Sequence, residues 1–253
     1  MSLARRAARL PSIARDGWRY PALRVRARGE DTAVEALVAL GFDEAELRAY
    51  EREFEEVAPT IYARLAETAH AGGDELAAER AAAHSESSEE GKKLLYLSVR
   101  VVRPRMVVET GPFNGASSAF LLQALDACRH GRLISFDLPD ARDALGVPIP
   151  AGREPAWLVP DELRSRLTLV LGDVRETLRP KLARERTVDL FFHDSLHTTR
   201  HMLFEFRVAW RHLRPGGVLV SDDVFWNPAF WLFTRAHHVP FRHIGTMGVT
   251  RKP

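Results

Sequence analysis

The stretch that decides the fold is VVETGPFNGASS, residues 107–118, where an apolar run leads into a glycine-rich turn and the start of a helix. Gly111 and Gly115 allow positive φ and close approach of a ligand to the backbone, and Ser117 or Ser118 can begin the helix. A dinucleotide fingerprint reads G-x-G-x-x-G, whereas these glycines are spaced G-x-x-x-G with Phe113 in a glycine position. A plain tight turn is the alternative interpretation.

Four more apolar runs follow this turn, and each closes on an acidic residue: RLISFD, LTLVLGD, VDLFFHD and GVLVSDD. Short runs of Val, Leu, Ile and Phe that alternate with helical stretches are typical of a parallel sheet covered on both faces. Helices are predicted over 117–130 and 199–213, the second stopped by LRPGG, which turns into the fifth strand. Residues 240–253 predict one or two final strands, as an antiparallel edge hairpin.

The first third of the chain has a helical pattern instead. Apolar residues recur every three or four positions from 32 to about 83, Pro59 is expected to kink or split the second helix, and a further helix is predicted over 89–102. We therefore divide the chain into a basic arm over 1–29, a helical appendage or lid over 30–90, and an α/β domain over 91–253. The net charges of 1–29, 30–90 and 91–253 are +7, −13 and +8, within a total of +2.

Composition excludes several classes of protein. No stretch approaches the roughly 20 apolar residues of a membrane span, and a single cysteine, Cys128, forms no intrachain disulfide, so a cytoplasmic protein is expected. The basic arm fits a transit peptide, a surface for anionic lipid or nucleic acid, or an arm that lies on the acidic segment of its own or a neighbouring chain. The last interpretation needs no further partner, so we expect no nucleic acid, and a homodimer through the N-terminal helices is an open option.

Acidic residues end the first three predicted strands, at the sheet edge where ligands of such folds bind. Glu109 would repel a phosphate but suit a positively charged ligand. Asp137 can accept both hydroxyls of a ribose, and Asp173 can accept a hydrogen bond from an exocyclic amine. Taken singly, each acid also fits a helix cap or a solvated turn.

From about Lys92 to the C-terminus the sequence resembles the class I S-adenosylmethionine-dependent methyltransferases, mainly in ETGPFNG and HLRPGGVLVSDD. The resemblance implies a Rossmann-like doubly wound sheet of seven strands with an antiparallel last strand. It also implies that the glycine turn holds the amino-acid end of S-adenosylmethionine, that Asp137 binds its ribose and that Asp173 lies near its adenine. The cofactor-binding residues predicted in this way are Glu109, Gly111, Phe113, Asn114, Gly115, Ser117, Asp137, Asp173 and Asp194.

Asp194, Asp222 and Asp223 end the fourth and fifth strands, which are expected to lie side by side. Such a cluster is costly unless a cation or proton relieves it, and oxygen ligands of this kind suit Mg²⁺. The arrangement is similar to the metal-dependent O-methyltransferases that act on catechols and sugars. In the sugar-modifying group a histidine three residues after the first metal acid is the proposed general base, and DSLH places His197 at that spacing. The alternative is that Asp194 only orients substrate and that one of the other two caps a loop.

The sequence thus predicts a methyltransferase that moves the methyl group of S-adenosylmethionine to a hydroxyl of a small molecule, with Asp194 and His197 as the catalytic residues. Metal-independent transfer, N-methylation, a nicotinamide-dependent oxidoreductase and a non-catalytic binding protein are the alternatives. The proline-rich stretch over 139–162, which contains Trp157, is expected to act as a lid.

Overall fold

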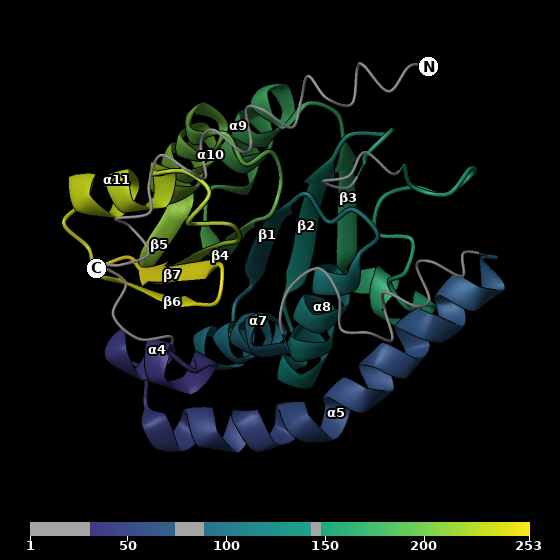
Figure 1. The fold of residues 1–253 in the computed structure, drawn as a ribbon, viewed down its shortest axis with the longest axis horizontal. Coiled ribbons are helices and arrows are strands. Elements are labelled where there is room, and N and C mark those ends of the chain that lie inside the picture. The colour runs from purple at the N-terminus through teal and green to yellow at the C-terminus, as the bar shows by residue number, and fades with distance from the viewer. Residues whose placement is uncertain (1–30, 74–88, 143–147) are drawn as a thin grey trace.

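The computed structural model describes residues 31–73, 89–142 and 148–253. Seven strands form one sheet in the order β3-β2-β1-β4-β5-β7-β6 (Figure 1). β7 is antiparallel to both of its neighbours, whereas the pairs among β1 to β5 are parallel. The predicted doubly wound sheet with an antiparallel last strand is therefore confirmed. The strands are β1 (Met106–Thr110), β2 (Arg132–Asp137), β3 (Leu167–Leu171), β4 (Val188–His193), β5 (Leu213–Ser221), β6 (Phe241–Ile244) and β7 (Met247–Arg251).

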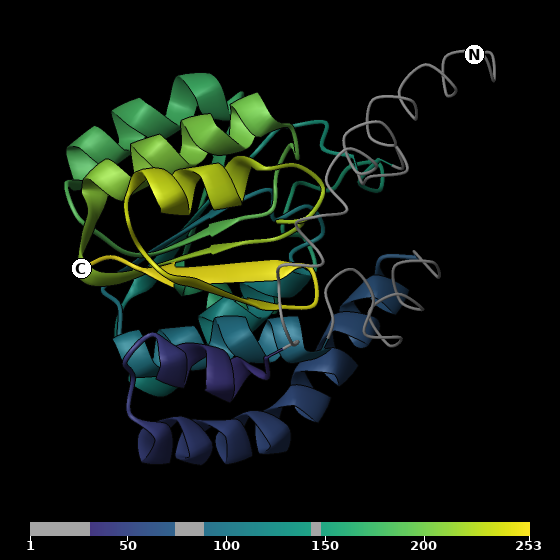
Figure 2. The same ribbon diagram turned by 60° about the vertical axis from the view of Figure 1, so that its left-hand side comes forward.

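Helices cover both faces of this sheet (Figure 2). On one face lie α7 (Glu89–Val102) and α8 (Ala116–Cys128), and on the other lie α9 (Val174–Glu185), α10 (Thr199–His212) and α11 (Ala229–Ala236). Every residue of β1 and β4 is buried. This is why these strands read as continuous apolar runs rather than as an alternating pattern.

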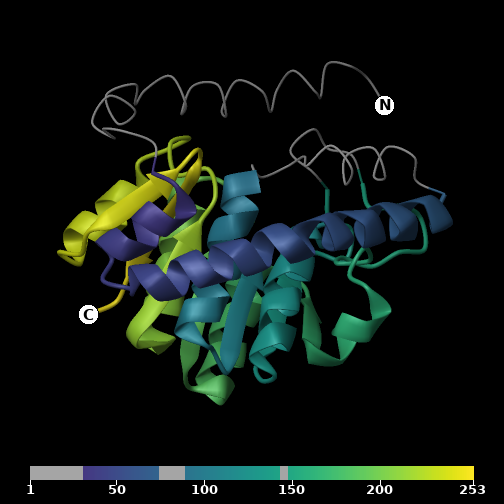
Figure 3. The ribbon, with the colours of Figure 1, turned by 90° about the horizontal axis from the view of Figure 1, so that it is seen from below.

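The N-terminal helices add an outer layer beyond α7 and α8. α4 (Ala33–Ala39) begins at Thr32 with a capping box to Glu35, and α5 (Glu44–Ala71) begins at Asp43 and runs across the helices beneath it (Figure 3). Pro59 does not split α5, which continues through this residue, and the alternative expectation of a kink agrees with the bend of α5 in Figure 1. The helix predicted over 89–102 is confirmed with the same bounds.

Polar contacts fix α5 to the domain at several points. Glu53 of α5 accepts hydrogen bonds from the hydroxyl of Tyr96 and, at 2.9 Å, from the guanidinium of Arg100, both on α7. Further along, Arg64 pairs with Glu162 at 2.7 Å, in the short 3₁₀ helix η1 (Asp161–Arg166). The described part of the appendage therefore contacts the domain at both α7 and η1. Its role as a lid or as a dimer contact stays a prediction.

LRPGG was expected to form a turn before the fifth strand, but β5 already begins at Leu213, because Gly216 N donates to Lys252 O and Lys252 N donates to Gly217 O beside β7. The basic arm over 1–29 lies outside the described residues. Within the described ranges, no helix is long and apolar enough to cross a bilayer.

Candidate active site

Backbone hydrogen bonds bring the predicted site residues to one edge of the sheet. Gly111 N donates to Phe136 O at 2.9 Å, Asp194 N donates to Thr110 O at 2.9 Å, and Asp222 N donates to His193 O at 2.8 Å. These bonds continue the pairing of β2, β1, β4 and β5 just beyond the strand ends. The glycine turn therefore lies between Asp137 and Asp194, and Asp194 lies beside Asp222.

The glycine turn needs its glycines because of the protein's own packing. Gly111 and Gly115 have φ of 78° and 97°, and Phe113 between them has φ of 44°. A Cβ atom on Gly111 would lie 2.2 Å from the carbonyl oxygen of Asp194, and one on Gly115 would lie 2.7 Å from Ala156 Cα. Side chains at these positions would force apart the turn, the end of β4 and the 148–160 segment. Ligand approach is thus not the only reason for this spacing.

Glu109, at the end of β1, is fully buried. Its carboxylate accepts hydrogen bonds from the hydroxyls of Ser117, Ser118 and Ser135 at 2.5–2.6 Å. Burial raises the pKa of Glu109, and the three hydroxyl donors oppose that effect. The carboxylate therefore fixes the start of α8 against β1 and β2, and Ser117 takes part in this support. Direct contact of Glu109 or Ser117 with a cofactor stays a prediction.

Asp137 joins the glycine turn to the end of β2. Its carboxylate accepts hydrogen bonds from the backbone N–H groups of Phe113 at 3.0 Å and Leu138 at 2.8 Å. Burial raises its pKa to about 6, because the ionised carboxylate loses hydration there. Asp137 is thus held at the turn with a titration near the physiological range.

Asp173, at the end of β3, caps α9 in the structure. It accepts hydrogen bonds from Arg175 N at 2.8 Å and from the Arg175 side chain, which lowers the pKa of Asp173 to about 2. This is the helix-cap alternative that the sequence left open. Gly172 N donates to Asp137 O at 2.8 Å. Asp173, the next residue in the chain, therefore still lies near the end of β2. Its contact with an adenine stays a prediction.

The imidazole of His197 lies between two carboxylates. His197 Nε2 is 3.7 Å from Asp194 Oδ1, and His197 Nδ1 is 3.6 Å from Asp223 Oδ2. Nε2 is buried and makes no hydrogen bond, while 18% of the side chain is exposed. Burial, and then the neighbouring His193, lowers the pKa of His197 to about 3, so the ring is neutral at physiological pH. A neutral imidazole is the form that can accept a proton.

Aromatic rings and a buried amide complete the surroundings of His197. The ring of His193 stands edge-on to that of His197 with centroids 5.3 Å apart, and the Trp226 ring lies 6.2 Å away. Asn227 Nδ2 donates to His197 O at 3.3 Å and to Met202 Sδ at 3.0 Å. The loop after β5 is therefore tied to the loop after β4, which limits the movement of the imidazole.

Asp222 does not complete a metal site with its neighbours. Its Oδ1 accepts hydrogen bonds from Thr246 Oγ1 at 2.7 Å and from Asp223 N at 2.8 Å, and the side chain is buried. Burial, and then the charge of Asp222, raises the pKa of Asp223 to about 7, so this pair need not carry two full charges. Over 31–73, 89–142 and 148–253, no group of three or more His, Cys, Asp or Glu residues is arranged to hold a metal ion.

The predicted Mg²⁺ site of Asp194, Asp222 and Asp223 is thus not supported. Hard divalent ions need several oxygen atoms that converge on one point at about 2.0–2.6 Å. Here the imidazole of His197 stands between Asp194 and Asp223, and Asp222 is turned toward the β6–β7 hairpin. The side chains therefore do not fit the ion.

A buried glutamate beneath this site was missed by the sequence analysis. Glu205 of α10 is fully buried and accepts hydrogen bonds from Thr110 Oγ1 and Ser195 Oγ, both at 2.6 Å. Ring nitrogens of His193 and His201 each lie 2.7 Å from its carboxylate. Burial alone would raise the pKa of Glu205, but the two histidines outweigh it and the pKa is lowered. A lone glutamate on a predicted amphipathic helix gave no signal of this role.

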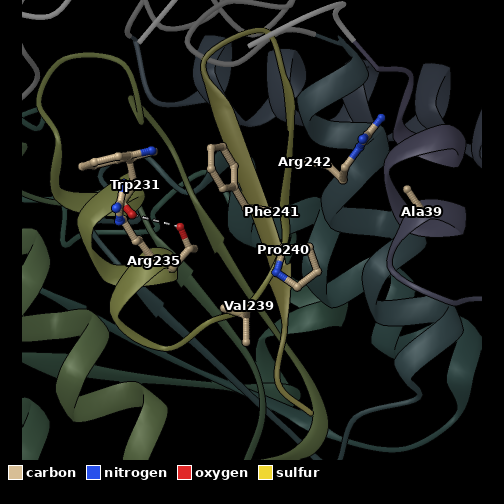
Figure 4. Close-up of a pocket in the computed structure, with 8 residues that line it drawn as sticks. Ala39, Trp231, Arg235, Val239, Pro240, Phe241 and Arg242 are labelled. Carbon is tan, nitrogen blue, oxygen red and sulfur yellow. Dashed lines mark hydrogen bonds between the residues drawn. The ribbon is translucent and has the colours of Figure 1, made fainter. Parts of the chain in front are cut away.

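A cavity of about 390 Å³ lies away from these residues, among α4, α11 and the start of β6 (Figure 4). Trp231, Arg235, Phe241 and Arg242 are among the residues that line it. Arg235 lies over the Trp231 ring at 5.2 Å, and Arg242 pairs with Asp31 at 2.6 Å. None of the residues around this cavity is a predicted site residue, so it is not part of the candidate site.

Residues 108–224 match a family model described as a methyltransferase domain. This matched region, just under half of the chain, is similar to methyltransferase domains. The match spans the glycine turn, Asp137, Asp173, Asp194, His197 and both acids after β5, and the strand order is that of the expected fold. The match supports a methyltransferase rather than a nicotinamide-dependent oxidoreductase.

Solved structures share this fold at low sequence identity. A Klebsiella pneumoniae protein described as a candidate O-methyltransferase is 18% identical, with a TM-score of 0.55 over 81% of this chain and 96% of its own. The O-methyltransferase TomG of Streptomyces achromogenes is 20% identical, with a TM-score of 0.52 over 76% and 90%. CalS11, a TDP-rhamnose 3'-O-methyltransferase, is 23% identical, with a TM-score of 0.51 over 64% and 77%. Among curated proteins, none matches this sequence.

The residues of the site fit S-adenosylmethionine, unlike the metal ion. The tight turn over 111–115 presents backbone at the end of β1, and Asp137 stands beside it with a carboxylate held in place by two N–H groups. A carboxylate at the end of the second strand is the group that accepts the hydroxyls of a nucleoside ribose. The fit to the cofactor therefore depends on the turn over 111–115 and on Asp137 beside it.

Proposed function

We propose that this protein transfers the methyl group of S-adenosylmethionine to a hydroxyl of a small molecule, with His197 as the general base. One observation carries the proposal: the imidazole of His197 is held between Asp194 and Asp223 at the sheet edge, where Asp194 packs against the glycine turn. The base and the cofactor turn are thereby neighbours. The hydroxyl acceptor would lie between them.

Asp137 and the turn over 111–115 hold the cofactor in this proposal. Asp137 accepts the ribose hydroxyls, Asn114 and the backbone of the turn bind the amino-acid end, and Asp173 lies near the adenine. When bound, S-adenosylmethionine supplies an electrophilic methyl group on a positively charged sulfur. Asp194, whose backbone is in contact with Gly111, orients the acceptor and His197 rather than the nucleoside.

His197 takes the proton of the acceptor hydroxyl as the oxygen attacks the methyl carbon. Asp194 faces Nε2 and favours the tautomer with the hydrogen on that nitrogen, which leaves the lone pair on Nδ1. The proton therefore goes to Nδ1, next to Asp223. The ionised form of Asp223, whose pKa is raised to about 7, stabilises the imidazolium and so offsets the low pKa of His197. A positioned base of this kind accelerates a reaction about 10²–10⁴-fold.

No step of this mechanism goes through a metal ion. The carboxylates that would have to converge on a cation are separated by the His197 ring or bound to Thr246. The proposal is accordingly the metal-independent form of the reaction. The names of the structural neighbours support a small-molecule hydroxyl as acceptor, since one acts on a nucleotide-linked sugar and another takes part in tomaymycin synthesis.

The test combines binding and turnover. Calorimetric titration with S-adenosylmethionine measures cofactor binding, and transfer of a labelled methyl group to a panel of phenols, catechols, sugars and amines identifies the acceptor class. For His197→Asn we expect cofactor affinity within about twofold of wild type and turnover reduced about 10²–10⁴-fold. The matched control is His238→Asn, since His238 is exposed and has a positive φ that Asn tolerates.

Each part of the proposal fails on a different result. No cofactor binding at millimolar concentration defeats the enzyme assignment as a whole. Methylation of amines only defeats the hydroxyl acceptor. Activity that disappears with a chelator and returns with Mg²⁺ defeats the metal-independent form, and full turnover in His197→Asn with loss in Asp223→Asn makes Asp223 the base.

A further inference from the structure

Trp157 connects the glycine turn with the C-terminal end of α5. This residue belongs to the proline-rich segment between β2 and β3, and it is buried. Its indole Nε1 donates a hydrogen bond to Asn114 Oδ1 at 2.8 Å. Asn114 lies inside the turn between Phe113 and Gly115. The indole is thus in direct contact with a residue that is predicted to bind the cofactor.

The backbone around Trp157 forms a clamp on the same turn. Ala156 N donates to Phe113 O at 2.7 Å, and Leu158 N donates to Asn114 O at 2.9 Å. Arg164 in turn donates to the carbonyl oxygens of Ala156 and Trp157 at 3.2 and 2.9 Å. Ala156 has φ of 61°, a left-handed conformation that residues with a Cβ rarely adopt. The segment therefore holds a strained geometry in order to pair with the turn.

The other edge of the indole ring faces the last turn of α5. A Cβ atom on Gly72, the residue that ends α5, would lie 2.9 Å from Trp157 Cζ3. Arg153 covers the indole, with its guanidinium carbon 5.4 Å from the ring centre. The ring is thus enclosed by α5, Arg153 and the turn. Its position is fixed by packing, and its N–H is directed at one acceptor.

We propose that Trp157 is a positioning residue for cofactor binding, because it fixes the orientation of the Asn114 amide. The inference rests on the proposed function, in which the turn binds the amino-acid end of S-adenosylmethionine. Since Asn114 Oδ1 accepts from the indole, the opposite end of the amide, Nδ2, is the end turned away from Trp157. An amide N–H₂ donates to a carboxylate, whereas an amide oxygen would repel it. Trp157 thereby presents a donor to the carboxylate of the amino acid.

The test is Trp157→Phe, which keeps a flat ring against Gly72 and removes only the N–H donor. Without that donor the Asn114 amide turns freely, and its oxygen loses a partner. We expect the Kd for S-adenosylhomocysteine to rise about tenfold and the KM for S-adenosylmethionine to rise with it, while kcat at saturating cofactor stays within about twofold. The matched control is Trp231→Phe, which alters a half-buried tryptophan of α11 outside the site and should leave both constants unchanged.

A double-mutant cycle shows whether the effect passes through Asn114. In an Asn114→Ala background, Trp157→Phe should cause no further loss of affinity, because the only group that the indole orients is gone. Additive losses in the cycle overturn the inference. A spectroscopic signature accompanies it: cofactor binding should change the tryptophan fluorescence of wild type, and most of that change should be absent in Trp157→Phe.

Failure of this inference is distinguishable from failure of the proposed function. If wild type does not bind S-adenosylhomocysteine, the proposed function falls. If wild type binds and Trp157→Phe binds equally well, only the role of Trp157 falls. A lowered thermal midpoint together with a proportional loss of kcat would assign Trp157 to folding and overturn the positioning role.

Discussion

Cofactor affinity should depend on pH through Asp137. Burial raises the pKa of this carboxyl from 3.8 to about 6, so its ionised form is disfavoured in the folded protein. By linkage the group favours the folded state below a pH of about 4, and that contribution is lost as the pH rises through about 6. Cofactor affinity has the opposite pH dependence and should increase as the pH rises, because the ionised carboxylate is the better acceptor for two ribose hydroxyls.

The magnitude follows from the ionised fraction. With a pKa of about 6, roughly a tenth of the molecules carry the ionised carboxylate at about pH 5, and nearly all of them at about pH 7.5. The apparent Kd for S-adenosylhomocysteine should therefore be about tenfold higher at the lower pH. Replacing Asp137 with Asn keeps one acceptor but removes the charge, which should weaken binding about 10–100-fold and remove its dependence on pH.

Calorimetric titration at several pH values between these limits measures the effect. The matched control is Asp140→Asn, three residues further along and exposed, which should behave as wild type at every pH. A wild-type Kd that is constant over this range refutes the argument. So does the same pH dependence in Asp137→Asn, since another group would then be responsible.

Two substitutions test the frame that supports the site. Glu205→Gln removes a buried charge that contacts four side chains, so the free energy of unfolding in urea should fall by about 3 kcal/mol. The loss should be larger at neutral pH than below about pH 4, where the carboxylate of the unfolded chain begins to take up a proton. The control Glu176→Gln, at an exposed position, should change the free energy little, and equal stability of the two variants would contradict this role. Gly111→Ala places a Cβ 2.2 Å from the Asp194 carbonyl oxygen. Its thermal midpoint should fall much further than that of Gly152→Ala, which has φ of 79° and no atom near its Cβ and so measures only backbone strain, about 1–2 kcal/mol. Equal shifts of the two midpoints would contradict the close approach at Gly111.

Much of the fold could be predicted because parallel strands that are buried on both faces leave a clear trace in sequence. The five apolar runs and the helix over 89–102 are where they were expected. The seven-stranded doubly wound sheet came from the family resemblance rather than from the runs themselves. Local breakers give way to tertiary packing: α5 continues through Pro59 where it lies against α7 and α8, and LRPGG joins β5 because Gly216 and Gly217 pair with Lys252 beside β7.

The sequence predicted where the site residues lie along the backbone but not which side chains they contact. Acids at successive strand ends had to share one edge, since parallel strands carry their ends to the same side. Side-chain partners, some near in sequence and some distant, then decided what each acid does. Asp173 is engaged by Arg175, Glu109 by three serines, and Trp157 reaches Asn114 across 43 residues. Such pairings depend on side-chain directions, which spacing along the chain does not encode.

The aspartates after β4 and β5 illustrate this limit. Their spacing is equally compatible with a cation between three carboxylates and with an imidazole between two of them. Thr246, in the turn of the β6–β7 hairpin, draws Asp222 aside, and the positive φ of 52° at Asp223 directs the next carboxylate toward His197. The imidazole separates two of the carboxylates without adding a charge, since the pKa of His197 is lowered to about 3, and the raised pKa of Asp223 limits the remaining repulsion. The same cluster can therefore serve proton transfer, and the chelator experiment separates the two uses.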